Sequence, residues 1–207
     1  MIDISASKQG KEILHKIISS IALLGYGQGE NWIGCCRKRE NFSLKSMKQT
    51  INLFCAHFSQ DSRKCTVVSS LIRDCFFPID YSPKILKFAK PIEKKLIKDN
   101  LLHLDREHDG IESLSSPERF RIYSSPDIET LKNLSFTLMT NSRIFGHLFF
   151  VFDELNVIAY PHDETGFGFI TINGTTQNVD LKVSSFLLEA SLIDNVESIY
   201  QLSRPTP

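Results

Sequence analysis

The sequence predicts an α+β fold in which a helical N-terminal portion precedes a small antiparallel β-sheet with flanking helices. Two observations lead to this prediction. Residues 1–104 contain several apolar stripes at three- and four-residue spacing, the periodicity of amphipathic helices. Residues 145–172 contain three runs rich in aromatic and β-branched side chains, separated by polar turn residues.

A polar segment separates the two portions. Residues 105–118 combine many charged residues with Gly110 and a Ser-Ser-Pro ending, which is typical of a linker or a surface loop. We therefore expect a mainly helical portion over residues 1–104 and a sheet portion over residues 119–203, with one continuous domain as the alternative. Residues 204–207 should form a disordered tail.

Four segments of the first portion are predicted to be helical: Ile4–Leu24, Ser43–Phe58, Ser62–Phe76 and Pro83–Leu102. The third helix should turn Cys65, Val68, Leu71, Ile72 and Cys75 inward. A break or kink is expected before Pro91, because proline removes a helical hydrogen bond. The basic run Arg37-Lys38-Arg39, in the segment Asn31–Glu40, is predicted to be a solvated turn, with a phosphate contact as the alternative.

The second portion should alternate strands and helices. Arg119–Ser124 alternates charged and apolar residues, as an edge strand does, and Ser125-Pro126-Asp127 is a typical start for a helix that runs to about Thr140. The three strands are expected at Phe145–Phe152, Val157–Tyr160 and Phe167–Ile172. A helix follows from Val179 or Asp180 to about Leu192, with Val183, Phe186, Leu187 and Ala190 as its apolar residues. Val196–Leu202 should be a short strand or a frayed helix.

Composition limits the function classes. The formal net charge is zero, but residues 35–100 carry 14 Lys and Arg against 6 Asp and Glu, whereas residues 101–207 carry 7 against 15. The chain starts without a signal-peptide pattern, and its longest apolar run is Leu148–Phe152, so we expect a cytoplasmic protein without a membrane segment. The five cysteines should be reduced thiols, and we expect no metal and no cofactor.

Acidic pairs lie in the two turns between the three strands. Asp153 and Glu154 follow the first strand, and Asp163 and Glu164 follow the second, next to His162. Successive antiparallel strands reverse direction, so the two turns should lie at opposite ends of the sheet and not form one carboxylate dyad. The sequence also lacks the common hydrolase and nucleotide-binding motifs. A hydrolase or nuclease using His108, His162 and nearby carboxylates remains the alternative.

The hairpin Tyr160-Pro-His-Asp-Glu-Thr-Gly-Phe-Gly-Phe169 resembles the Tyr-Asp-Asp-Arg-Gly hairpin of small bacterial proteins, some of them immunity proteins of polymorphic toxin systems of the contact-dependent inhibition type. The acidic pair and the glycine correspond to Asp163, Glu164 and Gly166, whereas Thr165 stands in place of the arginine. The resemblance implies a non-catalytic inhibitor that binds a cognate toxin domain.

Charge suggests how such an inhibitor would bind. A toxin that cuts nucleic acid tends to have a basic cleft, to which an acidic surface is complementary. The expected partner-binding residues are Asp153, Glu154, His162, Asp163 and Glu164.

A basic surface is the alternative binding site. The predicted helix Pro83–Leu102 carries Lys84, Lys87, Lys94, Lys95 and Lys98 on its polar side. A solvated helix face is the simplest interpretation, so we do not expect a nucleic-acid partner. A nucleic-acid-associated regulator that uses these lysines is the third hypothesis.

Overall fold

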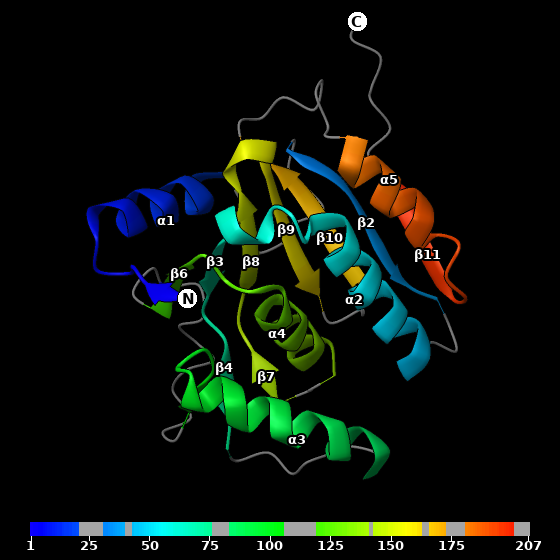
Figure 1. Cartoon of the computed structure of the whole chain (residues 1–207), viewed down its shortest axis with the longest axis horizontal. Helices are drawn as coiled ribbons and strands as arrows, with labels where there is room; N and C mark the ends of the chain where they lie inside the picture. Colours follow the sequence, from blue (N-terminus) through cyan, green and yellow to red (C-terminus); the bar gives the residue numbers. More distant parts are fainter. Residues whose placement is uncertain are drawn as a thin grey trace, which may run out of the picture.

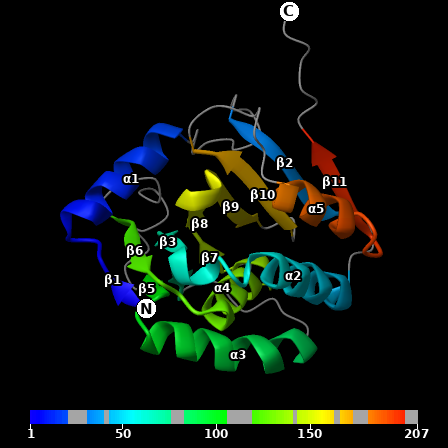
Figure 2. The same ribbon diagram turned by 45° about the horizontal axis from the view of Figure 1, so that its top comes forward.

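In the described part of the chain, a central β-sheet has one helix on one face and three helices on the other, and a further helix packs against this layer beside the small sheet (Figures 1 and 2). The computed structural model describes residues 1–20, 31–39, 43–75, 83–105, 119–140, 143–162, 166–172 and 181–200. Helix α1 (Lys8–Ser20) covers one face. Helices α2 (Leu44–Phe58), α4 (Ile128–Thr140) and α5 (Leu181–Ala190) cover the other face. Helix α3 (Pro83–Lys98) packs against α4.

The central sheet has eight strands, and every neighbouring pair is antiparallel. In spatial order they are β1 (Ile2–Asp3), β6 (Arg121–Ser124), β3 (Thr66–Ser69), β8 (Leu148–Phe152), β9 (Val157–His162), β10 (Gly166–Thr171), β2 (Trp32–Lys38) and β11 (Val196–Tyr200). The predicted hairpin strands, β8 to β10, therefore form the centre of the sheet.

The predicted fold class is wrong, because the N-terminal half contributes strands to this sheet. Arg37 and Lys38, expected in a solvated turn, lie in β2, which pairs with β10 and β11. Strand β3 lies between β6 and β8. Strands from both sides of residues 105–118 thus share one large sheet.

The predicted helix at Ser62–Phe76 is also wrong. This segment forms a short 3₁₀ turn, η2 (Ser62–Lys64), followed by β3 and by β4 (Ile72–Asp74). Both faces of the central sheet are covered, so β3 is buried along its whole length and lacks the alternation that marks a half-exposed strand. The predicted burial of Cys65, Val68, Leu71 and Ile72 is correct, whereas Cys75 is exposed.

A second, smaller sheet continues from the first. In it β4 pairs in parallel with β5 (His103–Asp105) and antiparallel with β7 (Ile144–Phe145). Helix α3 connects the two parallel strands, and it is continuous through Pro91, so the predicted break is absent. Gly146 divides the predicted strand Phe145–Phe152 between the two sheets. Its φ of 112° is a conformation that glycine adopts without strain.

The larger core lies between the central sheet and helices α2 to α5. Phe54 and Phe58 of α2 meet Phe150, Phe152, Phe167 and Phe169 of the sheet and Phe186 of α5. A smaller core under α1 contains Ile17 with Phe149, Ile158 and Ile170. Neighbouring residues of β8 and β9 point into different cores, which explains why β8 is apolar at every position and β9 is so from Val157 to Tyr160.

Candidate functional site

The first acidic turn is ion-paired within the chain. Asp153 and Glu154 begin the 3₁₀ turn η5 (Asp153–Leu155), between β8 and β9. An Asp153 carboxylate oxygen lies 3.0 Å from Nζ of Lys16 on α1, and Glu154 lies 2.8 Å from Nζ of Lys64 in η2. All four side chains remain about half exposed or more. Lys16 and Lys64 therefore offset the negative charge of Asp153 and Glu154.

The second turn joins β9 to β10, and its acidic pair, Asp163 and Glu164, lies outside the described residues, as do His108 and the linker at 106–118. His162 ends β9, and its Nε2 lies 3.1 Å from the carbonyl oxygen of Cys36 on β2. The antiparallel pairing of β8, β9 and β10 places the two turns at opposite ends of β9, about 17–20 Å apart.

The glycines of this hairpin have a packing role. A Cβ on Gly168 would lie 2.1 Å from Cζ of Tyr160, so the tyrosine ring occupies the space above the glycine. The ring thereby spans β10 and reaches β2, where Nε1 of Trp32 donates a hydrogen bond of 3.2 Å to the tyrosine oxygen. Burial raises the pKa of Tyr160. These contacts join the three strands. A Cβ on Gly166 would meet the carbonyl oxygen of Cys36 on β2, so close packing accounts for both glycines without a ligand.

Among the described residues, the closest arrangement to an acid–base site lies in the small sheet, and no sequence motif predicts it. Asp74 and Asp105 are register partners at the carboxyl ends of the parallel strands β4 and β5. Arg143 lies beside Asp74: its Nη2 donates to the Asp74 carbonyl oxygen at 2.7 Å, and the Asp74 amide donates to the Arg143 carbonyl oxygen at 2.9 Å. Adjacent carboxylates at the carboxyl ends of parallel strands are a common place for catalysis or metal binding.

Burial argues against catalysis at this cluster. Asp74 is fully buried and Asp105 and Arg143 nearly so, so a substrate has no direct access to the carboxylates. On the other side of the small sheet, Nε of Arg73 lies 3.4 Å from an Oε of the buried Glu93 of α3. No three His, Cys, Asp or Glu side chains gather as a metal site within the described part of the chain. We interpret the cluster as a structural one.

The described lysines of the predicted helix Pro83–Leu102 are exposed, as its pattern predicts. Lys87, Lys94, Lys95 and Lys98 of α3 all face solvent, and so does Lys90. The side chain of Lys84 is outside the described part of the structure. Lys95 pairs with Asp99 at 2.6 Å, and this hydrogen bond raises the pKa of the lysine.

Helix α2 extends this surface. Nζ of Lys48 lies 4.1 Å from the centre of the Phe88 ring, a cation–π contact between the N-terminal parts of α2 and α3. Phe88 is 48% exposed. The exposed Lys45 lies in the first turn of α2, within one turn of Lys48.

An apolar surface on α5 is the feature that sequence reasoning missed. Leu181 and Leu188 on α5 and Leu192 directly after it are 86%, 64% and 81% exposed. Their spacing of seven and four residues places them on one side of the helix, away from its buried side. Beside α5, the strand β11 forms an edge of the central sheet, and Tyr200 at its end is 43% exposed. We call Leu181, Leu188 and Leu192 the leucine surface.

The chain matches no family model, no curated protein and no solved structure. Among the helices of the described ranges, none combines the length and the apolar character that a membrane span requires.

Proposed function

We propose that this protein is a non-catalytic, cytoplasmic inhibitor that binds a protein partner, an immunity-type protein that neutralises a cognate toxin domain. The leucine surface is the observation that supports this proposal most directly. Three large apolar side chains exposed together on one helix mark a protein-binding surface, because each gains about 1.5–3 kcal/mol when it is removed from water.

Core packing and ion pairs fix the backbone of α5 beneath the leucine surface. Val183, Phe186, Leu187 and Ala190 bury the opposite side of α5 in the core. At the side of the helix, Lys182 pairs with Asp61 at 2.6 Å and Glu189 lies 3.2 Å from Nε2 of His57. A partner therefore meets side chains whose backbone is already fixed, which lowers the entropy lost on binding.

The acidic turns keep a secondary role in this proposal. Asp153 and Glu154 already have lysine partners, so a basic toxin surface would compete with Lys16 and Lys64 for them. Exposed charges of this kind mainly affect the rate of association. We favour the His162–Gly166 turn over Asp153 and Glu154, so Asp163→Ala with Glu164→Ala should weaken binding more than Asp153→Ala with Glu154→Ala.

The experiment starts from a partner captured from the native cell and then purified. We expect Leu188→Ser with Leu192→Ser to weaken its binding by at least about a hundredfold, and the same variant to lose protection when the partner is produced in cells. Ile2→Ser is the matched control, because Ile2 is 66% exposed on β1 at the other edge of the sheet. Unchanged affinity in the double leucine variant, or a partner that is not toxic, would overturn the proposal.

A further inference from the structure

A basic surface formed by α2 and α3 lies apart from the leucine surface on α5. It consists of Lys45 and Lys48 of α2 and Lys87, Lys90, Lys94 and Lys98 of α3, with Phe88 between them; we call it the lysine surface. Within the described part of the chain, none of these lysines forms an ion pair; Lys48 is the one that contacts the Phe88 ring.

The arrangement of these lysines is unfavourable for the isolated chain. Lys90, Lys94 and Lys98 follow one another at four-residue spacing, and like charges at this spacing destabilise a helix by about 0.2–0.5 kcal/mol per pair. The first turns of α2 and α3 contain no acidic residue, although the N-terminal end of a helix favours negative charge. Sequences depart from such local rules mostly at functional positions.

We propose that the lysine surface binds an acidic segment of a protein partner, with Phe88 contacting an apolar side chain of that segment. Carboxylates along the partner would offset the repulsion between the lysines. Phe88 supplies apolar contact area beside the charges, since almost half of its surface is open to solvent. This binding site is additional to the proposed toxin-inhibitor function, and it can be tested without a toxin.

Two features favour an acidic protein over nucleic acid. The surface contains lysines and no arginine, although the planar arginine side chain is the one that binds phosphate with two parallel hydrogen bonds. One face of Phe88 is occupied by Lys48, which leaves a poor platform for stacking bases.

The test uses the purified full-length protein and a fluorescent peptide of four Glu-Glu-Phe repeats. We expect binding that weakens as salt rises from about 50 mM to about 200 mM, and at least about tenfold weaker binding for Lys87→Glu with Lys94→Glu. These changes should not unfold the protein. A glutamate near the start of α3 favours the helix dipole, and one at position 94 forms opposite-charge pairs with Lys90 and Lys98.

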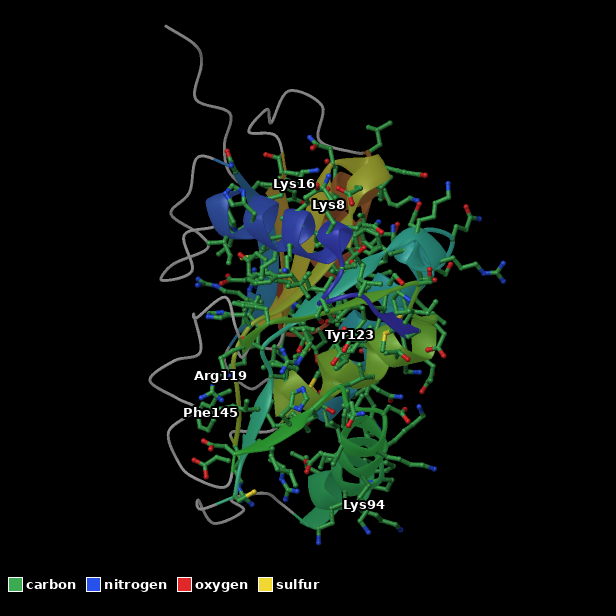
Figure 3. All side chains as sticks on the ribbon, turned by 90° about the vertical axis from the view of Figure 1, so that its left-hand side faces the viewer. Lys8, Lys16, Lys94, Arg119, Tyr123 and Phe145 are labelled. Atoms are coloured by element: carbon green, nitrogen blue, oxygen red, sulfur yellow. The ribbon has the colours of Figure 1, made fainter. Side chains whose placement is uncertain are left out.

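Lys8→Glu with Lys11→Glu is the matched control, because it makes the same change of net charge on exposed lysines of α1. Figure 3 shows Lys8 and Lys94 at opposite ends of the molecule. Equal losses in the two double variants would mean that the peptide responds to net charge alone, and would overturn the proposal. The proposal would also fail if a short DNA of equal charge bound more tightly than the peptide, or if Phe88→Ala left the binding of the peptide unchanged.

Discussion

Phe54 is the side chain on which the larger core most depends. It is fully buried on α2. Its ring stacks on Phe167 of β10 with centres 4.1 Å apart and planes 4° from parallel, and on Phe58 at 4.7 Å. Phe186 of α5 meets it edge-on at 5.9 Å. Phe54→Ala would therefore remove contacts between α2, the central sheet and α5 at once.

We expect Phe54→Ala to lower the free energy of unfolding strongly. Truncating a buried phenylalanine to alanine costs about 3–5 kcal/mol, and aromatic pairs contribute about 0.5–1.5 kcal/mol each beyond the area that they bury. Because three rings lie close to Phe54, we expect Phe54→Ala to lower the free energy of unfolding by about 5 kcal/mol, the upper end of this range. Domains of this size have a free energy of unfolding of about 5–15 kcal/mol, so the variant should be marginally folded. Phe54→Leu, which keeps most of the volume, should cost less.

Urea denaturation followed by fluorescence of Trp32, the single tryptophan, measures this free energy. Phe88→Ala is the control, because its exposed ring should change the stability by no more than about 1 kcal/mol. If Phe54→Ala lowers the free energy of unfolding by less than about 1.5 kcal/mol, or by no more than Phe88→Ala does, the core does not depend on Phe54 as we infer.

Three further predictions concern charge and reactivity. Asp153→Ala with Glu154→Ala should change the free energy of unfolding by less than about 1 kcal/mol per ion pair, because both pairs are exposed; a larger loss in thermal or urea melts would contradict this. Burial lowers the pKa of His147 below its ordinary value of 6.5, so the folded state favours the neutral ring. The contribution of His147 to stability should then be fully present above pH 6.5 and decrease as the pH falls below that value. Thermal melts at pH values above and below 6.5 should show a weaker pH dependence for His147→Phe. Cys75 is exposed whereas Cys65 is buried with its pKa raised, so mass spectrometry after alkylation of native protein should find Cys75 modified and Cys65 protected until the protein unfolds.

The sequence predicts helices better than strands in this protein. The apolar stripes of α1 and α2 have the helical period and one buried side, so both helices form inside their predicted ranges. Strand β3 is buried on both faces, and without alternation its residues fit a helix equally well. The three hairpin strands were recognisable because polar turn residues separate them.

The candidate sites were likewise predictable only where a local sequence pattern determines exposure. The exposure of Lys87, Lys94, Lys95 and Lys98 follows from the pattern of α3 alone. The spacing in α5 predicts Val183, Phe186, Leu187 and Ala190 as its apolar side, and the structure buries all four. No local pattern predicts that three further leucines of this region stay exposed. The ion pair between Lys16 and Asp153 joins residues that are far apart in the chain, so no local pattern predicts it.

The position of β2 has a consequence during synthesis. Both strands that flank it come from the C-terminal part of the chain: Cys35 lies opposite Gly168 on one side and Ile199 on the other. At about 5–20 residues per second, a ribosome needs roughly 7–27 s after making Cys35 to reach Gly168, and longer to reach β11. Throughout that interval the hydrogen-bonding groups of β2 have none of their native partners on the nascent chain. We therefore expect the yield of folded protein to depend on cellular factors that shield this strand until its last neighbour is made.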